Sequence, residues 1–324
     1  MKRNFRRLPA IVAIALAVTG CGGSRALLDD ATKGGALPGA VELTATPFFP
    51  QDDYQCGPAA LATVLSDSGV AVTPDELVAR VYIPGRRGSL QVELLAAARS
   101  AGRLAYVLDP ELGAILAELD AGRPVLVLQN LGFGVAPVWH YAVVVGYDAA
   151  AGTLALRSGR TSRKVVTATR FRRTWDDGDH WAIVVLPPGE LPVTPDRARY
   201  LEAAVALETA GPPGAAIAAF AAAVERWPDS AAARFGLANA HYASGDLQAA
   251  GDTYRRALDF HPDEPALLNN LAQVLLELEQ CDDARATIDR AVAHGAAQPS
   301  LQDAIADTRA EIHRRCADDE ASAR

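Results

Sequence analysis

Residues 51–65 read QDDYQCGPAALATVL, and they place a cysteine directly before a glycine, a proline and a run of helix-forming residues. Proline suits the first turn of a helix, so the sequence predicts a short helix from Gly57 to Ser66. Cys56 then lies at the helix N-terminus, where the helix dipole and the free N–H groups favour the thiolate, the nucleophilic form of cysteine. A buried packing residue is the alternative role for Cys56.

The residues that follow predict further helices and then strands. Thr73 and Glu76 have capping-box spacing and open a second helix, and the segments 89–102 and 109–122 each end at a glycine, as helices often do. Apolar β-rich runs predict strands at 104–109, 124–129, 140–147, 153–158 and 181–187. Helices followed by antiparallel strands indicate an α+β domain over residues 42–190, and not a doubly wound sheet.

A cysteine that attacks an amide needs a general base and a donor for the oxyanion. Four of the six histidines lie beyond residue 240, which leaves His140 and His180. His140 opens a predicted strand after the loop LGFGVAPVW, so its ring can face a cleft at the strand end. His180 lies in the polar turn TWDDGDHW, which is typical of a surface loop.

Four segments carry a specific resemblance: Gln51, then QCGPAAL, then GRPVLVLQ, then HYAVVVGYD. In this order they resemble the bacteriocin-processing, double-glycine leader peptidases and their stand-alone relatives, which have a papain-like fold. The resemblance covers about 45–190. It implies that Cys56 is the nucleophile, His140 the general base and later acid, and Gln51 the oxyanion-hole donor. Gln51 stands five residues before the cysteine, where many relatives have six.

The third member of the family's triad departs from the pattern. In the family an aspartate on the next strand orients the histidine, and it aligns here with Ser158. Asp148 is too distant, because the strand from His140 to Tyr147 carries the chain roughly 23 Å at about 3.3 Å per residue. Serine accepts a hydrogen bond from imidazole but does not stabilise imidazolium as a carboxylate does. The later loop offers alternative carboxylates at Asp176, Asp177 and Asp179.

Residues 1–20 have the features of an export signal: four positive charges, an apolar run and the sequence VTGC. Small residues before a cysteine resemble the lipobox of bacterial lipoproteins, which implies cleavage after Gly20 and acylation of Cys21. An ordinary secretory signal is the alternative. We expect a lipid-anchored protein of the bacterial cell envelope, at the outer membrane facing the periplasm because Gly22 follows the cysteine. Residues 21–41 are small, polar and glycine-rich, and they predict a flexible tether.

Charge and cysteine spacing limit the possible ligands. Removing the four signal-peptide cations changes the net charge from −8 to −12, so the mature chain has no general attraction for nucleic acid or anionic lipid. We expect the membrane to be contacted through the lipid alone. No Cys or His cluster has metal-ligand spacing, so neither a metal nor another cofactor is expected. Trp139, Trp175 and Trp181 are expected to pack or to line the cleft.

From residue 191 the chain becomes an alanine-rich helical region with a 34-residue period. The pairs Trp227-Pro228 and His261-Pro262 are 34 residues apart, and three further columns keep the register: Ala216, Ala250 and Ala284; Ala223, Ala257 and Ala291; Phe220, Tyr254 and Ile288. The pattern resembles the tetratricopeptide repeat, in windows 197–230, 231–264 and 265–298 with a capping helix at about 299–316. It implies an all-α solenoid over 191–318 that binds a protein partner.

Cys281 begins the second helix of the third repeat, and Cys316 ends the capping helix. Antiparallel packing of these two helices brings their cysteine ends together, which predicts a disulfide that closes a 35-residue loop. Two separate buried thiols are the alternative.

Two functions of different class follow. The first is a lipid-anchored cysteine peptidase that hydrolyses peptide or isopeptide bonds, with repeats that recruit a protein substrate or partner. The second is a catalytically weakened peptidase fold that binds peptides. The double-glycine substrate is not carried over, because the leader peptidases act on the cytoplasmic side and we expect this chain on the other side.

Overall fold

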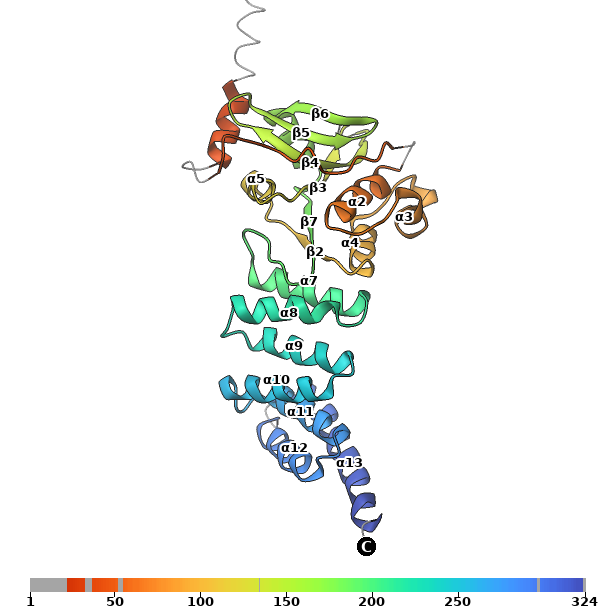
Figure 1. The fold of residues 1–324 in the computed structure, drawn as a ribbon, viewed down its shortest axis with the longest axis vertical. Coiled ribbons are helices and arrows are strands. Elements are labelled where there is room, and N and C mark those ends of the chain that lie inside the picture. Colours follow the sequence, from red (N-terminus) through yellow and green to blue (C-terminus); the bar gives the residue numbers. More distant parts are fainter. Residues whose placement is uncertain (1–21, 33–36, 52–54, 134, 296–297, 323–324) are drawn as a thin grey trace, which may run out of the picture. The chain divides into compact units, whose positions relative to one another are not determined.

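The computed structural model describes residues 22–32, 37–51, 55–133, 135–295 and 298–322 of the chain. The chain divides into two compact units. The first runs up to Pro187 and includes Leu191–Pro195, and the second comprises Pro188–Glu190 and the residues from Asp196 onward. Figure 1 shows the elements of each unit in chain order. Within the described ranges, no helix is both long and apolar enough to cross a membrane.

The first unit is built on an antiparallel sheet with the spatial order β2-β7-β3-β4-β5-β6, and β1 pairs with β4 outside this path. The α+β architecture expected from the sequence is therefore confirmed. The strands are β1 (Ala40–Glu42), β2 (Leu104–Val107), β3 (Val125–Asn130), β4 (Trp139–Asp148), β5 (Thr153–Ser158), β6 (Thr161–Thr167) and β7 (Ala182–Leu186).

Three helices pack on one face of this sheet: α2 (Cys56–Asp67), α3 (Pro74–Val81) and α4 (Gln91–Ser100). The predicted capping box opens α3, because the Glu76 carboxylate accepts hydrogen bonds from the amide and the hydroxyl of Thr73. The buried apolar side chains of the three helices meet those of β3, β4 and β7 in one core. This core holds the N-terminus of α2 against the middle of the sheet.

Two further helices, α5 (Leu112–Asp120) and α6 (Ala168–Asp176), contact other parts of the sheet. The sequence predicts α5 but neither β6 nor α6. β6 is an edge strand with mostly exposed side chains, so it lacks the apolar alternation that marks a half-buried strand. α6 is polar except for Phe171 and Trp175, which are both buried.

The expected flexible tether over 21–41 is wrong for most of its described part. Residues 22–31 are helical, and they dock on the first unit. The Leu28 side chain is fully buried, and the Ser24 and Thr169 hydroxyls lie 2.9 Å apart in a hydrogen bond. Composition misled the prediction here, because a short helix with few apolar residues is stabilised by tertiary packing and not by its own propensity. Residues 1–21, with Cys21, lie outside the described residues.

The second unit is a series of antiparallel helix pairs, as the 34-residue period predicts (Figure 1). The repeated alanines and the large residues between them are all buried. Gly236 permits one close approach, because a Cβ atom there would lie 2.2 Å from the Phe220 ring. The helices are α7 (Arg197–Ala210), α8 (Ala215–Arg226), α9 (Ala231–Ala243), α10 (Leu247–Phe260), α11 (Pro265–Glu277), α12 (Cys281–Gly295) and α13 (Pro299–Ser322).

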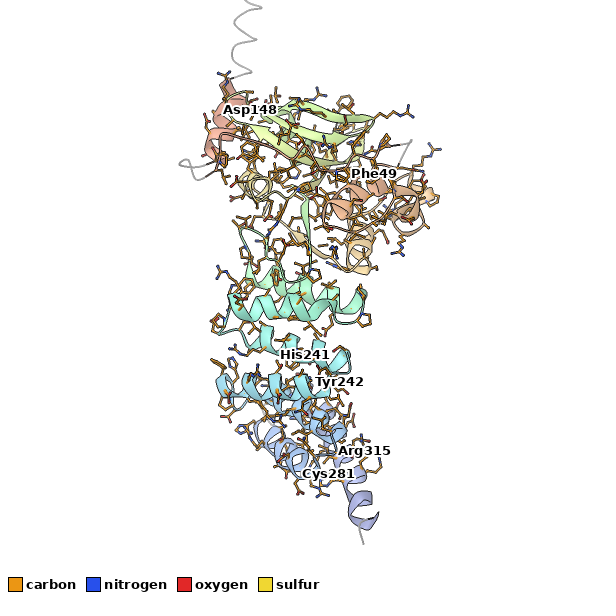
Figure 2. The ribbon with its side chains drawn as sticks, in the orientation of Figure 1. Phe49, Asp148, His241, Tyr242, Cys281 and Arg315 are labelled. Atoms are coloured by element: carbon orange, nitrogen blue, oxygen red, sulfur yellow. A yellow bond between two sulfur atoms is a disulfide. The ribbon has the colours of Figure 1, made fainter. Side chains whose placement is uncertain are left out.

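Cys281 and Cys316 are joined by a disulfide with a Cα–Cα separation of 5.7 Å. The bond links the first residue of α12 to α13, which extends to Ser322 and so beyond the end predicted at 316. The Arg285 guanidinium donates a hydrogen bond to the Cys316 carbonyl and adds a second link between these helices. Figure 2 shows Cys281 on the second unit.

Candidate active site

Cys56 is the first residue of α2, and its side chain is half-buried at the edge of the core. The next residue has a structural role that the sequence does not reveal. A Cβ atom on Gly57 would lie 2.3 Å from the Ser89 hydroxyl oxygen, so only glycine fits this close approach. Gly57 therefore has a packing role, because it lets the segment before α4 pack beside Cys56.

The Cys56 thiol is influenced by two opposing effects. Burial raises its pKa, and hydrogen bonds from the backbone N–H groups of Tyr141, Gly57 and Cys56 itself act against that rise. The Tyr141 amide matters most for the geometry, because it belongs to the residue after His140. The sulfur therefore lies against the backbone of the strand that carries the candidate base.

His140 is the second residue of β4, and it pairs in register with Gln129 on β3. Its Nε2 atom lies 2.9 Å from the Ser158 hydroxyl oxygen, in a hydrogen bond. Burial and then the nearby positive charge of Lys164 lower the pKa of His140 to about 4. The imidazole is therefore neutral at neutral pH, and Nδ1 is the nitrogen left to act on the thiol. Among the described contacts, no hydrogen bond yet joins Nδ1 to Cys56.

Ser158 ends β5, and its side chain is buried. A register shift between β4 and β5 and another between β5 and β6 place it beside His140 and opposite Thr161. Asp148 lies at the other end of the hairpin, paired with Thr153, and its carboxylate accepts a hydrogen bond from the Ala151 amide. In Figure 2, Asp148 and Phe49, which precedes Gln51 by two residues, lie on opposite sides of the first unit.

Among the alternative carboxylates at Asp176, Asp177 and Asp179, Asp176 has other partners. Asp176 bonds His180, with 2.7 Å between its Oδ1 atom and Nε2, and it also pairs with Arg172. The His180 ring packs edge-on against Trp175, so His180 belongs to a surface turn as expected. Trp175 and Trp181 are packing residues, whereas Trp139, beside His140, is 54% exposed.

Gln51 is brought to the same end of the sheet by its backbone. Its amide donates a 3.2 Å hydrogen bond to the Gly159 carbonyl, one residue after Ser158. α2, β4, β5 and the segment before α2 thus hold Cys56, His140, Ser158 and Gln51 near one end of strands β4 and β5. The role of Gln51 as an oxyanion donor stays a prediction, because its hydrogen bond among the described residues is made by the backbone and not by the side chain.

A cluster of exposed apolar side chains precedes His140 in the loop between β3 and β4. Leu131, Phe133, Val135 and Val138 are 42–97% exposed, and the loop carries no charged residue. The Asn130 carboxamide oxygen accepts hydrogen bonds from the Gly132 and Val138 amides and fixes the base of the loop. This loop forms an apolar border beside the candidate site.

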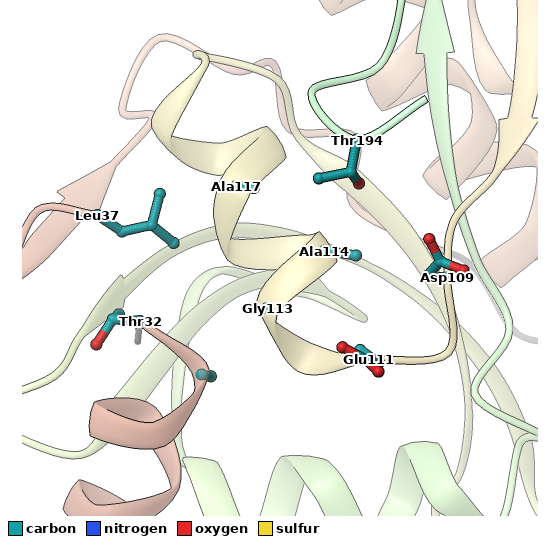
Figure 3. Close-up of a pocket in the computed structure, with 9 residues that line it drawn as sticks. Thr32, Leu37, Asp109, Glu111, Gly113, Ala114, Ala117 and Thr194 are labelled. Atoms are coloured by element: carbon teal, nitrogen blue, oxygen red, sulfur yellow. The ribbon is translucent and has the colours of Figure 1, made fainter. Parts of the chain in front are cut away.

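The first unit also has a cavity that is separate from the candidate site. This cavity of about 280 Å³ is lined by Ala31, Thr32 and Leu37, by five residues in and before α5, and by Thr194 (Figure 3). None of its lining residues belongs to α2, β4 or β5. Within the described ranges, no three His, Cys, Asp or Glu side chains are grouped as metal ligands would be.

The fold and the site define a class. An antiparallel α+β domain places a helix-start cysteine against a histidine-bearing strand, and a helical-repeat unit follows it. Residues 43–177 match the family model described as "Peptidase_C39 like family", and residues 201–265 and 242–307 match tetratricopeptide-repeat models. The chain therefore carries a peptidase C39-like domain followed by tetratricopeptide repeats.

Several solved structures are similar to one or the other part. A putative C39-like peptidase from Bacillus anthracis is 18% identical, with a TM-score of 0.37, over 45% of this chain and 97% of that one. The peptidase domain of Streptococcus ComA, a bi-functional ABC transporter, is 22% identical, with a TM-score of 0.37, over 44% and 98%. The Yersinia enterocolitica type III secretion translocator chaperone SycD is 17% identical, with a TM-score of 0.36, over 38% and 85%. No curated protein is a significant match.

Proposed function

We propose that the first unit is a cysteine peptidase in which Cys56 is the nucleophile and His140 the general base. One observation carries the proposal: the Cys56 sulfur accepts the amide of Tyr141, while the adjoining His140 ring is oriented by Ser158. The family match over 43–177 agrees with it.

The pKa directions indicate how this pair works. A raised thiol pKa and a lowered imidazole pKa mean that the resting site is a neutral thiol beside a neutral ring, and not a thiolate–imidazolium pair. Proton transfer then accompanies attack. His140 Nδ1 takes the thiol proton as sulfur bonds to the substrate carbonyl carbon, and the carbonyl electrons move to oxygen.

The remaining steps return the site to its resting state. Imidazolium gives the proton to the departing amine, and the carbon–nitrogen bond breaks to leave a thioester on Cys56. Water then attacks the thioester with His140 as base, which releases the acid and restores the thiol. The Gln51 carboxamide is the proposed donor to the oxyanion.

Cleavage of a peptide library by the full chain tests the proposal, with products identified by mass spectrometry. We expect cleavage by the wild-type protein and its loss in Cys56→Ala and in His140→Ala. Cleavage that persists in Cys56→Ala would assign the activity to other residues.

The second candidate is a peptide-binding module with weakened catalysis, and the observation in its favour is Ser158 where the family has an aspartate. A neutral partner leaves imidazolium without a compensating charge. This candidate predicts that Cys56→Ala binds library peptides as tightly as the wild-type chain, and that neither protein cleaves them.

We further propose that the protein is a lipoprotein acylated on Cys21 and held in the cell envelope, with a protein or peptide partner on the repeats. The signal-like segment and the VTGC sequence support the anchor, and the repeat matches support the partner. Mass spectrometry of the N-terminal peptide from membrane fractions tests the anchor. An unmodified Cys21, or a chain starting elsewhere, would exclude it.

A further inference from the structure

The hydrogen bond between His140 and Ser158 can be made in two ways, and only one suits catalysis. If the serine hydroxyl donates to Nε2, the neutral ring carries its proton on Nδ1 and cannot accept the thiol proton there. If Nε2–H donates to the serine oxygen, Nδ1 has a free lone pair and can act as the base. An acceptor on the far side of Ser158 would draw the hydroxyl proton away from the ring and select the productive form.

A cavity adjoins Ser158, and His140 is not among the residues that line it. It has a volume of about 20 Å³ and lies near the surface, because Arg170, which lines it, is exposed. Ser158, Gln129 and Thr174 line it with buried polar side chains, and the Gln129 carboxamide is fixed by donating a 2.7 Å hydrogen bond to Thr174.

The charges around this cavity are all positive. Lys164 on β6 and Arg170 on α6 line it, and no aspartate or glutamate does. Lys164 pairs in register with Leu156, two residues before Ser158. Neither cation forms an ion pair with any residue that the structure describes. Two unpaired cations beside a serine hydroxyl are chemically suited to a small anion.

We propose that this cavity binds a small monovalent anion, such as formate or chloride, which accepts the Ser158 hydroxyl proton and completes the site. The inference rests on the proposed peptidase function and deepens it. The anion supplies the negative charge of the family's aspartate, but Ser158 lies between it and the histidine. Nε2–H donates to Ser158, and Ser158 donates to the anion. Its charge also offsets that of Lys164 beside the ring, so imidazolium forms more readily during attack.

Binding is tested first, without reliance on activity. In ³⁵Cl NMR of the full chain, we expect broadening of the chloride line that formate reverses in the wild-type protein and that is absent in Lys164→Gln. Arg172→Gln is the control, because Arg172 lies on α6, which also carries the cavity residue Arg170, but it is outside the cavity. Broadening that is equal in Lys164→Gln and the wild-type protein would overturn the proposal.

The catalytic part is tested by the rate at which a neutral peptide electrophile alkylates Cys56 at pH 7 and constant ionic strength. We expect formate to raise this rate saturably, by about tenfold, the value of one charge-assisted hydrogen bond. Ser158→Ala and Lys164→Gln should lose the dependence on formate, and Arg172→Gln should keep it. A rate that formate leaves unchanged, or changes equally in Ser158→Ala, would overturn the inference.

The anion can come from solution or from a carboxylate of the peptide. Electrophiles that differ only in Glu or Gln beside the reactive group separate these sources. Faster labelling by the Glu compound without formate, and no further gain with it, assigns the anion to the substrate; equal labelling assigns it to solution. If Cys56 stays unlabelled even in Ser158→Asp, the peptidase proposal fails, and the NMR result still decides on anion binding.

Discussion

Among single residues, the protonation of the site depends on the groups that surround the His140 ring and the Cys56 thiol. Burial and the nearby positive charge of Lys164 keep the ring uncharged, and burial keeps the Cys56 thiol protonated. The sequence predicts Cys56, His140 and Ser158 as site residues, because the types and order of these residues are visible in it. It does not reveal the Tyr141 amide, the Lys164 charge or the contact between Gly57 and Ser89, since these depend on how strands and helices meet.

Ser158→Asp should convert the site toward an ion pair. A carboxylate beside Nε2 raises the pKa of His140 from about 4, and the imidazolium then lowers the pKa of the Cys56 thiol. In alkylation measured against pH, we expect the midpoint to fall by about one unit or more. Ser158→Asn is the neutral control and should keep the wild-type midpoint, and a midpoint shared by the Asp and Asn variants would contradict this electrostatic account.

At the scale of the element, the site depends on how tightly α2 packs. Gly57→Ala should destabilise the first unit by about 1–3 kcal/mol, because the added methyl group overlaps Ser89. Urea unfolding measures the loss. The double change with Ser89→Gly removes the clash and should restore most of the stability. No recovery in the double variant would mean that the strain lies elsewhere.

The helix over 22–31 gives a second test at this scale. Leu28 is fully buried, so Leu28→Ala should cost about 2–5 kcal/mol of unfolding free energy in the first unit. The neighbouring Leu27, which is only half-buried, is the matched control and should cost less when changed to alanine. A negligible effect of Leu28→Ala would restore the interpretation of this segment as a tether.

The elements that the sequence predicts are those with an apolar period, such as α2–α5 and the strands β2–β5 and β7. β6 and α6 were missed because one is an exposed edge strand and the other is a polar helix held by Phe171 and Trp175. These two elements carry Lys164 and Arg170. The part of the site that tunes the histidine therefore comes from the least predictable part of the sheet.

At the scale of the whole molecule, the chain combines a peptidase-like unit with a repeat unit closed by a disulfide. Reduction of Cys281–Cys316, or the double change to alanine, should destabilise the end of the repeat unit by up to about 4 kcal/mol, the loop-entropy value for 35 residues. Limited proteolysis should then cut α13 first. Equal protection of α13 in the oxidised and reduced proteins would show that helix packing alone holds it.

The central claim is that His140 takes the proton of the Cys56 thiol, and the most direct measurement is the rate of Cys56 labelling by a peptide electrophile at neutral pH. We expect His140→Ala to slow the labelling by about a hundredfold or more, because the general base is lost. His180→Ala, which removes the ring bonded to Asp176, should label at the wild-type rate. Equal labelling of Cys56 in the His140→Ala and His180→Ala proteins would contradict the claim.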